Sequence, residues 1–197
     1  YKRQLFYDDN YHYSLSSIGK YGNLYFTKCP LDTATDYCKI YSAQYSGNKL
    51  INIKQLNSEI NPGNSNSRHP SFTTLAGNEY LIFSSDRDGG IGGYDIWHSM
   101  KNHNGEFENC INAGDKINSI ENEITPFFFA KDTVLYFSST WHNSIGGYDI
   151  FSAFGNFKHW ESPDNIGTPI NSSYDDLYYN FHHNSRQAYF VSNRKGC

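Results

Sequence analysis

Two glycine-rich segments carry most of the charged side chains that could do chemistry. Asp86, Arg87 and Asp88 lead into Gly-Gly-Tyr-Asp-Ile, and the same five letters return later in the chain. A carboxylate after a glycine turn can accept hydrogen bonds from backbone N–H groups, and an arginine can pair with a carboxylate in the same connection. These residues recur, whereas an active site occurs once, so we predict a structural role. The residues assigned to it are Asp86, Gly93, Tyr94, Asp95, Gly147, Tyr148 and Asp149.

Metal, nucleotide and nucleophile signatures are missing from the sequence. Asp86-Arg87-Asp88-Gly89 opens like a calcium loop, but Trp97 stands where the closing Glu belongs. His182 and His183 are adjacent and would point to opposite faces of a strand. No Gly-x-Ser-x-Gly elbow is present. We therefore expect no metal, no cofactor and no catalytic residue, and a protein that is not an enzyme.

Large aromatic rings in predicted connections give a different hint. Trp141-His142 and Trp160 fall outside the expected central strands, and tryptophan is favoured at the centre of interfaces. Together with Arg87 and Asp88 they form the candidate interaction surface. The alternative is that the rings pack against an adjacent sheet.

Cysteine spacing allows one local disulfide. Cys29 and Cys38 flank a predicted hairpin loop, whereas Cys110 and Cys197 have no obvious partner. Two cysteines on paired strands can meet the required Cα separation, but two on opposite faces cannot, so reduced thiols remain the alternative. A bond between Cys29 and Cys38 would indicate an oxidising compartment.

The elements that must position these residues repeat along the chain. Phe26, Phe83, Phe137 and Phe190 sit in look-alike segments separated by 57, 54 and 53 residues. A repeat of this length is too short to bury a core alone, so the copies must pack on one another. We predict one domain over 1–197, with units at about 12–61, 69–118, 125–171 and a truncated 178–197. Residues 1–9, with Leu5-Phe6-Tyr7, are expected to be the last strand of a preceding unit.

The second unit predicts four antiparallel strands. Residues 69–74, 80–85 and 94–99 read as three strands, and 106–112 as a more polar outer strand. The run Tyr80-Leu81-Ile82-Phe83 is apolar on both faces, as in a strand between neighbouring sheets. Four-stranded sheets arranged radially are the blades of a β-propeller. The expected fold is all-β: a partial propeller of three full blades and the start of a fourth.

Composition agrees with this class and limits the partners. The aromatic share is 17%, and tyrosine and phenylalanine favour strands. The formal net charge is −4 and the basic residues are scattered, which argues against a nucleic-acid groove. No run approaches the roughly 18 apolar residues of a spanning helix. We expect no nucleic acid and no direct membrane insertion, and the absent start Met suggests a piece of a longer protein.

The segment from Phe83-Ser84-Ser85 through Gly92-Gly93-Tyr94-Asp95-Ile96-Trp97 resembles the WD40-like (PD40, TolB-like) propeller repeat. Its Gly-Gly-Tyr-Asp-Ile ending is similar to that in OmpA-family envelope proteins of Bacteroidota, including a component of type IX secretion and gliding machinery. The third unit departs from the pattern, with Thr140-Trp141 in place of the Asp-Arg pair, and the first unit lacks the glycines.

This resemblance implies a non-catalytic scaffold for protein–protein interaction, in the periplasm and associated with the outer membrane. Its partners would be other envelope proteins, with peptidoglycan reached through a domain outside this chain. Two alternatives remain open at this point. One is a glycan or peptidoglycan binder that uses Trp and Tyr platforms among Asn and Asp side chains; the other is the gating propeller of a serine peptidase.

Overall fold

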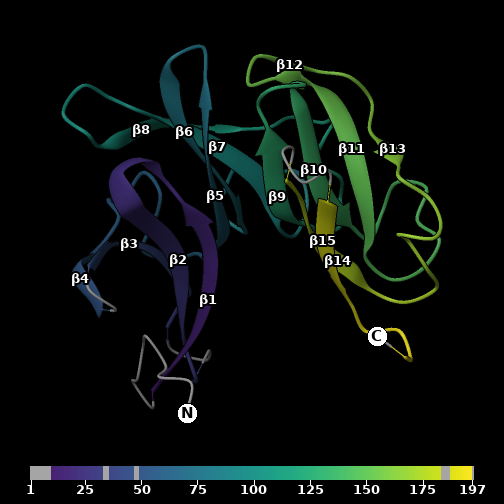
Figure 1. Ribbon diagram of the computed structural model, residues 1–197, viewed down its shortest axis with the longest axis horizontal. Helices are drawn as coiled ribbons and strands as arrows, with labels where there is room; N and C mark the ends of the chain where they lie inside the picture. The colour runs from purple at the N-terminus through teal and green to yellow at the C-terminus, as the bar shows by residue number, and fades with distance from the viewer. Residues whose placement is uncertain (1–9, 33–35, 47–48, 183–186, 197) are drawn as a thin grey trace.

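The computed structural model shows a chain made almost entirely of antiparallel sheets (Figure 1). It describes residues 10–32, 36–46, 49–182 and 187–196. The one short helical element in these ranges is a 3-10 turn at Lys20–Gly22, and none of the described helical structure could span a bilayer. The prediction of an all-β chain is confirmed. The expected strand at Leu5-Phe6-Tyr7 lies outside the described residues.

Four sheets follow one another along the sequence. Sheet 1 contains β1 (Tyr11–Ile18), β2 (Asn23–Pro30), β3 (Lys39–Ser46) and β4 (Lys49–Gln55). Sheet 2 contains β5 (Ser67–Leu75), β6 (Asn78–Ser85), β7 (Asp95–Lys101) and β8 (Phe107–Asn112). Sheet 3 contains β9 (Glu123–Phe129), β10 (Val134–Ser139), β11 (Asp149–Asn156), β12 (His159–Trp160) and β13 (Asp164–Asn165). Sheet 4 contains β14 (Asp176–His182) and β15 (Gln187–Ser192).

Each strand pairs with the next one along the chain, as hairpin connections dictate. The four strands predicted for the second unit are therefore confirmed, with β5 to β8 in that order. Sheet 3 differs in its outer position, where two short strands, β12 and β13, both pair with β11. Sheet 4 has two strands in the described part of the chain.

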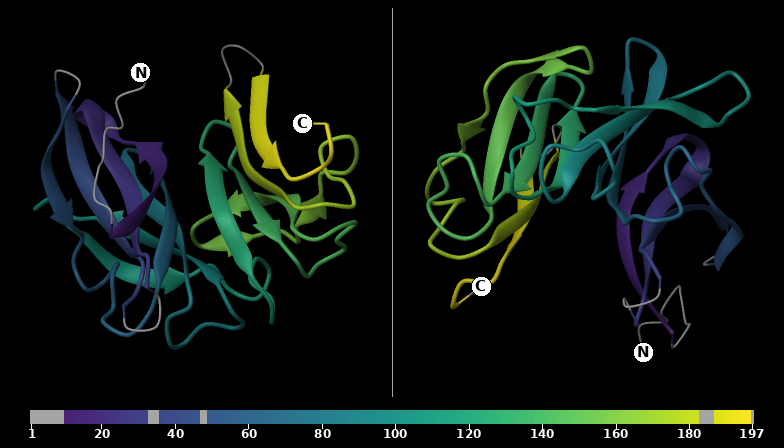
Figure 2. Two further views of the ribbon diagram at one scale, coloured as in Figure 1. Left: turned by 90° about the horizontal axis from the view of Figure 1, so that it is seen from below. Right: turned by 180° about the vertical axis from the view of Figure 1, so that it is seen from behind.

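The sheets lie along an arc with their first strands on the inside (Figures 1 and 2). The strands β1, β5, β9 and β14 contact one another in that order. Three of these inner strands bulge at equivalent positions, where His69, Thr125 and Tyr178 adopt positive φ angles of 52°, 52° and 59°. The same local irregularity at the same position indicates that each inner strand meets its neighbour in the same way.

The aromatic landmarks lie on the central strands, and Phe83 and Phe137 belong to the cores between sheets. Phe26, Phe83 and Phe137 are 1%, 0% and 1% exposed, because each lies on a second strand with a partner on both sides. Phe190 occupies the same place on β15 and is 36% exposed, because β15 pairs with β14 alone among the described strands.

An asparagine holds the third strand of each complete sheet. The side-chain amide of Asn118 donates to the carbonyl oxygen of Ile96 at 3.0 Å, and its oxygen accepts from the N–H of Ile96 at 2.7 Å. Asn61 and Asn171 do the same for Ile40 and Ile150. These bonds explain why an Ile-Asn pair closes each unit: the amide accepts from the buried N–H of the isoleucine and adds a second donor to its carbonyl oxygen, which a backbone N–H also reaches.

Cys29 and Cys38 are joined by a disulfide across the connection between β2 and β3. Cys29 lies near the end of β2 and Cys38 directly precedes β3. Because these two strands pair, the two cysteines lie side by side. Cys110 is a free, half-buried thiol in β8.

Candidate functional site

An open groove lies where the loops of sheets 2 and 3 meet. Its volume is about 780 Å3, within the range typical of ligand-binding pockets. Four segments line it: the loop after β6, the connection between the two sheets, the loop after β10 and the segment before β13. All four are connections at the same ends of the strands, where rigid sheets hold side chains from distant parts of the sequence close together.

Exposed apolar side chains line the groove around Trp141. The Trp141 ring is 49% exposed, and Ile91 and Ile120, which also line the groove, are 42% and 63% exposed. The backbone N–H of Trp141 donates to the hydroxyl of Ser139 at 3.0 Å, so the ring is anchored directly at the end of β10. An exposed aromatic ring flanked by aliphatic side chains is a surface suited to contact with another molecule.

Polar side chains line the same groove. Asp115, Lys116, Asn143 and Asp164 line the groove and are exposed. Within the described residues, none of these four side chains takes part in a hydrogen bond or an ion pair. They are therefore available to donate to or accept from a ligand, with two carboxylates, one ammonium and one amide among them.

His142 supports the groove from below. Its Nε2 atom lies 3.1 Å from the carbonyl oxygen of Ile117, and its ring packs against Phe137 and Phe151 with centroids 5.8 and 5.2 Å away. The histidine thus ties sheet 3 to the connection that follows sheet 2. Its position next to Trp141 fixes the loop that presents the tryptophan.

Arg87 makes the equivalent contact between sheet 2 and the connection that follows sheet 1. Its guanidinium donates to the carbonyl oxygens of Glu59 and Ile60, both at 2.7 Å, and to the hydroxyl of Ser85 at 3.0 Å. The sequence predicts a carboxylate partner for Arg87, but the structure gives its guanidinium backbone oxygens instead. Burial lowers the pKa of Arg87. Asp88 is exposed and does not line the groove.

Trp160, expected on the same surface as Trp141, is instead 6% exposed. Its ring packs edge-on against Phe128 and Phe157, both with centroids 5.9 Å away. Of the five residues of the candidate interaction surface, the structure brings Trp141 and His142 into one groove. Arg87, Asp88 and Trp160 lie elsewhere.

The glycine-rich segments lie against the following sheet. Asp95 accepts hydrogen bonds from the N–H groups of Ile91 and Gly92 at 2.5 and 3.2 Å, and Asp149 accepts one from Ile145. A Cβ atom on Gly93 would lie 2.5 Å from the side-chain oxygen of Asn122.

The tyrosines beside these aspartates also bond to the next sheet. The N–H of Tyr94 donates to the Asn122 side chain, and that of Tyr148 donates to the Asp175 side chain, both at 3.0 Å. A Cβ atom on Gly147 would come 2.1 Å from the same Asp175 side chain. Asp86, at the start of the first glycine-rich segment, accepts from the N–H and amide of Asn66 at 2.6 and 2.7 Å.

Glu123, a buried acid near the groove, forms its hydrogen bonds within the protein. Glu123 is 0% exposed, and burial raises the pKa of its carboxyl group. The carboxyl accepts from the N–H and hydroxyl of Ser119 at 2.7 and 2.6 Å and from the hydroxyl of Ser139 at 2.7 Å. These bonds hold the start of β9, so Glu123 is not open to a ligand, and Asp115 and Asp164 are the open carboxyl groups of the groove.

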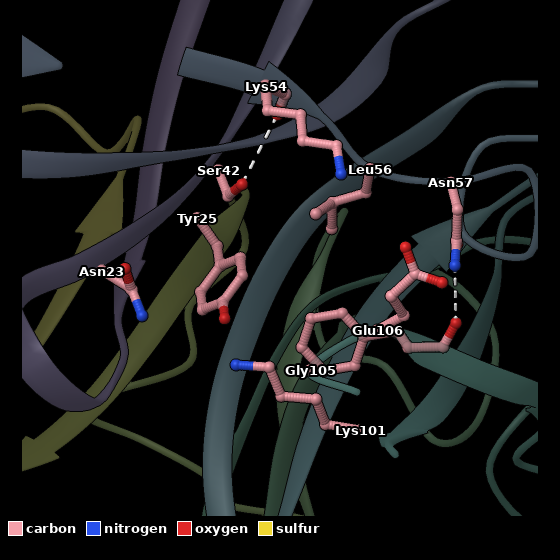
Figure 3. Close-up of a pocket in the computed structure, with 10 residues that line it drawn as sticks. Asn23, Tyr25, Ser42, Lys54, Leu56, Asn57, Lys101, Gly105 and Glu106 are labelled. Atoms are coloured by element: carbon pink, nitrogen blue, oxygen red, sulfur yellow. Dashed lines mark hydrogen bonds between the residues drawn. The ribbon is translucent and has the colours of Figure 1, made fainter. Parts of the chain in front are cut away.

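A second cavity, of about 230 Å3, lies between sheets 1 and 2 (Figure 3). Figure 3 shows Tyr25, Lys54, Lys101 and Glu106 around it. Lys101 is engaged with Glu79 at 3.1 Å, and the aromatic side chains of this cavity, Tyr25 and Phe107, are both 3% exposed. The cavity offers no exposed ring face, in contrast to the groove at Trp141.

Comparison with solved structures finds a similar fold in several glycoside hydrolases. An endo-arabinase from Bacteroides thetaiotaomicron aligns with a TM-score of 0.61 and 14% identity, over 96% of this chain and 72% of that one. A thermostable family-43 glycoside hydrolase aligns with a TM-score of 0.57 and 16% identity, over 87% and 62%. An α-L-arabinofuranosidase from Lactobacillus brevis aligns with a TM-score of 0.57 and 9% identity, over 92% and 66%. No protein-family model and no curated protein sequence matches the chain.

These comparisons correct several predictions. The resemblance to the WD40-like, TolB-like repeat is wrong, because no family model supports it and the similar solved structures are glycoside hydrolases. The non-catalytic scaffold of secretion or gliding machinery, and the expectation that the protein is not an enzyme, are overturned by the same finding. The short glycine-rich pattern forms a joint between sheets, and a local structural feature of this kind does not identify a function.

Sequence reasoning missed most of the groove. Asp115, Lys116 and Asp164 stand in connections with no motif around them, and Ile91 and Ile120 read as ordinary apolar residues. The one available signal was Trp141, a large ring that stands in the third unit at the position that Arg87 has in the second. The other residues become recognisable when the topology brings two loops and two connections together.

Proposed function

We propose that this chain is part of a carbohydrate-active β-propeller, with sheets 1, 2 and 3 as three full blades and sheet 4 as the start of a fourth. The groove around Trp141 binds a glycan. The observation that carries the proposal is the half-exposed Trp141 ring in an open groove that unpaired Asp, Asn and Lys side chains also line. The glycoside hydrolases of the same fold support it.

A sugar matches this surface because it has two kinds of faces. The C–H groups of a sugar ring can lie on the negative face of the Trp141 indole, while Ile91 and Ile120 extend the apolar contact. The hydroxyl groups around the ring then reach Asp115, Asn143 and Asp164. The two carboxylates accept hydrogen bonds from them, and the Asn143 amide both donates and accepts. The glycan class that the comparisons favour is one that contains arabinose.

The binding experiment uses Trp141→Ala. We expect the wild-type chain to bind arabinose-containing polysaccharide in affinity electrophoresis and calorimetry, and the variant to bind it roughly thirtyfold more weakly, about 2 kcal/mol, because the stacking surface is lost. Tyr21→Ala is the matched control, since Tyr21 is 94% exposed and outside the groove. Peptidoglycan is tested beside arabinan as the other glycan. Equal affinity of Trp141→Ala and wild type for every glycan bound would contradict the proposal.

Hydrolysis is the second candidate function, favoured by the two open carboxyl groups in the groove. Glycoside hydrolysis usually needs one carboxyl group as an acid and another as a base or nucleophile. Asp115 and Asp164 are exposed and line the groove from opposite connections of sheet 3, one before β9 and one at β13. Asp115→Asn and Asp164→Asn should each abolish release of reducing ends while keeping glycan affinity.

The control for hydrolysis is Asp88→Asn, which changes an exposed carboxylate that does not line the groove. Binding without any release of reducing ends by the wild-type chain would leave the glycan-binding proposal standing and remove hydrolysis. Release that survives both substitutions would also remove these two residues as the acid and the base.

Location and partners remain proposals. The Cys29–Cys38 disulfide supports an oxidising compartment, such as the bacterial periplasm. Association with the outer membrane and with other envelope proteins stays a prediction. Cell fractionation with antibody detection measures the first, and crosslinking in cells measures the second.

A further inference from the structure

The cavity between sheets 1 and 2 carries small polar side chains where the next joint carries rings. Asn23 and Ser42 line it, and the strand registers place them where sheet 2 has Tyr80 and His98. Between sheets 2 and 3 those two rings pack against Phe157, with centroids 4.2 and 4.9 Å away. The asparagine and the serine therefore leave space and hydrogen-bonding groups at a place where the other joint is aromatic.

Three polar side chains of this cavity have no partner within the described residues. Lys54 and Glu106 both line it and are exposed, yet they form no ion pair with each other or with another described residue. The side-chain amide of Asn23 likewise makes no hydrogen bond there. Figure 3 shows the three side chains around Tyr25 and Lys101. One ammonium, one carboxylate and one amide are thus available to a ligand.

The charges around the cavity favour a ligand with a single negative charge. Lys101 lines the cavity and is held by Glu79 at 3.1 Å, and Lys20 reaches the same carboxylate at 3.3 Å. These three groups and the pair of Lys54 and Glu106 amount to three ammonium groups against two carboxylates. One net positive charge remains, and the Lys101 ammonium is already fixed in position before a ligand arrives.

We propose that this cavity binds a monosaccharide-sized carboxylate that also carries hydroxyl groups, which is the chemistry of a sugar acid. The carboxylate is bound by the ammonium groups of Lys54 and Lys101 and accepts from the Asn23 amide. Glu106 accepts only, so it requires the hydroxyl donors of the ligand. A phosphate dianion fits less well, because its second charge would meet the Glu106 carboxylate without a further cation.

The size of the cavity agrees with a small ligand of this kind. Its volume is about 230 Å3, below the roughly 300–1,000 Å3 of pockets for drug-sized molecules. The lining side chains come from two sheets and none of them belongs to the groove at Trp141. The proposal is therefore independent of glycan binding in that groove.

The test titrates D-glucuronate into the 15N-labelled 197-residue chain and follows it by NMR. We expect saturable shifts of the backbone amide signals of residues 23–25, 54–57 and 101–107, which contain the lining segments. D-Glucose has the same ring without the carboxylate, and inorganic phosphate has the charge without the sugar hydroxyl groups. Each should bind about tenfold more weakly than glucuronate.

Two variants test the contacts. Lys54→Gln should weaken glucuronate binding about tenfold, because it removes the unpaired ammonium group. Lys49→Gln is the matched control, since Lys49 is an exposed lysine on the same strand and does not line the cavity. Asn23→Tyr, which copies Tyr80 of sheet 2, should abolish binding by occupying the cavity without any change of charge. Because Lys54 is exposed, Lys54→Gln tests the site even where Asn23→Tyr lowers stability.

Several results would overturn this proposal. They are no saturable binding of glucuronate by the wild-type chain, equal affinity for glucose or for phosphate, unchanged affinity in Lys54→Gln, and signal shifts that cluster around Trp141 instead of the cavity. Trp141→Ala should retain the affinity for glucuronate, and Lys54→Gln should retain the affinity for arabinan. The two sites can therefore fail independently.

Discussion

Single residues in this chain act mainly at the joints between sheets. Arg87 and His142, which lies one residue further along its unit, both reach the carbonyl oxygen of an isoleucine from the preceding connection, Ile60 or Ile117. Arg194 bonds in the same way to Ile170. An arginine and a histidine can exchange at this position because the joint needs an N–H donor above an aromatic core rather than a particular charge.

Gly146 shows how closely the sheets approach each other. A Cβ atom at this position would lie 2.3 Å from the carbonyl oxygen of Ser172. Gly146→Ala should therefore lower the free energy of unfolding by about 1–3 kcal/mol, because the backbone of the next connection must move. Urea denaturation followed by tryptophan fluorescence measures the loss.

Gly63→Ala is the matched control for this substitution. A Cβ atom on Gly63 would meet nothing within 4 Å. Alanine there should leave stability unchanged or raise it slightly, because it restricts the unfolded chain. Equal losses for the two variants would show that the close approach at Gly146 is not what requires glycine.

These joints also explain what could be predicted from the sequence. The Ile-Asn pairs and the glycine-rich segments recur because each serves the same backbone contacts in every sheet, so periodicity located the strands. The groove could not be located in this way, because Asp115 and Asp164 occur once and come together only through the arrangement of sheets 2 and 3. Trp160 was misplaced because a two-residue strand, β12, turns its ring into the core.

Second strands are the central elements of the packing. Phe137 on β10 is 1% exposed and belongs to the core cluster between sheets 2 and 3. Phe137→Ala should cost about 3–5 kcal/mol, as expected for a large ring removed from a packed core. Phe190→Ala, at the equivalent place on β15, should cost much less because the ring is 36% exposed.

Thermal and urea denaturation of the two variants measure this difference directly. Both substitutions remove the same atoms from equivalent strands. A difference between their stability losses therefore does not come from the intrinsic strand propensity of the residue. Similar losses at both positions would show that β15 is packed as tightly as β10, contrary to the exposure of Phe190.

The contact between β7 and the β11–β12 turn contains a neutral histidine. His98 is 5% exposed, and its ring lies 4.9 Å from that of Phe157. Burial lowers the pKa of His98 to about 4. In the unfolded chain a histidine has a pKa near 6.5, so the unfolded state binds the proton first as pH falls. Stability from this site is complete above about pH 6.5 and decreases as pH falls toward 4.

His98→Gln tests this dependence. The wild-type chain should lose up to about 3 kcal/mol at this site between pH 7 and pH 4, and the variant should show a correspondingly shallower loss. His69 contributes a loss in the same range, because burial also lowers its pKa to about 4, so some slope will remain. His103→Gln, at an exposed position, is the control. An unchanged pH profile in His98→Gln would contradict the assignment.

The entire chain behaves as a row of sheets, each stabilised by its neighbours. The described contacts run from sheet 1 to 2, 2 to 3 and 3 to 4 through the inner strands. In such an arrangement stability is approximately the sum of unit and nearest-neighbour terms, so cooperativity depends on the joints. The core between sheets 1 and 2 includes Ile60, whose carbonyl oxygen is bonded by Arg87.

Arg87→Met should therefore uncouple sheet 1 from the rest of the chain. The substitution keeps an unbranched apolar stem over Phe83 but removes the charged donors to Glu59, Ile60 and Ser85, so the joint loses three hydrogen bonds. In mild urea, hydrogen exchange should show sheet 1 opening at lower denaturant than sheets 2 and 3, whereas the wild-type sheets open together. Asp88→Asn, at the adjacent exposed position, should retain coincident opening. If Arg87→Met also opens all sheets together, the coupling resides in the apolar core and not in the arginine joint.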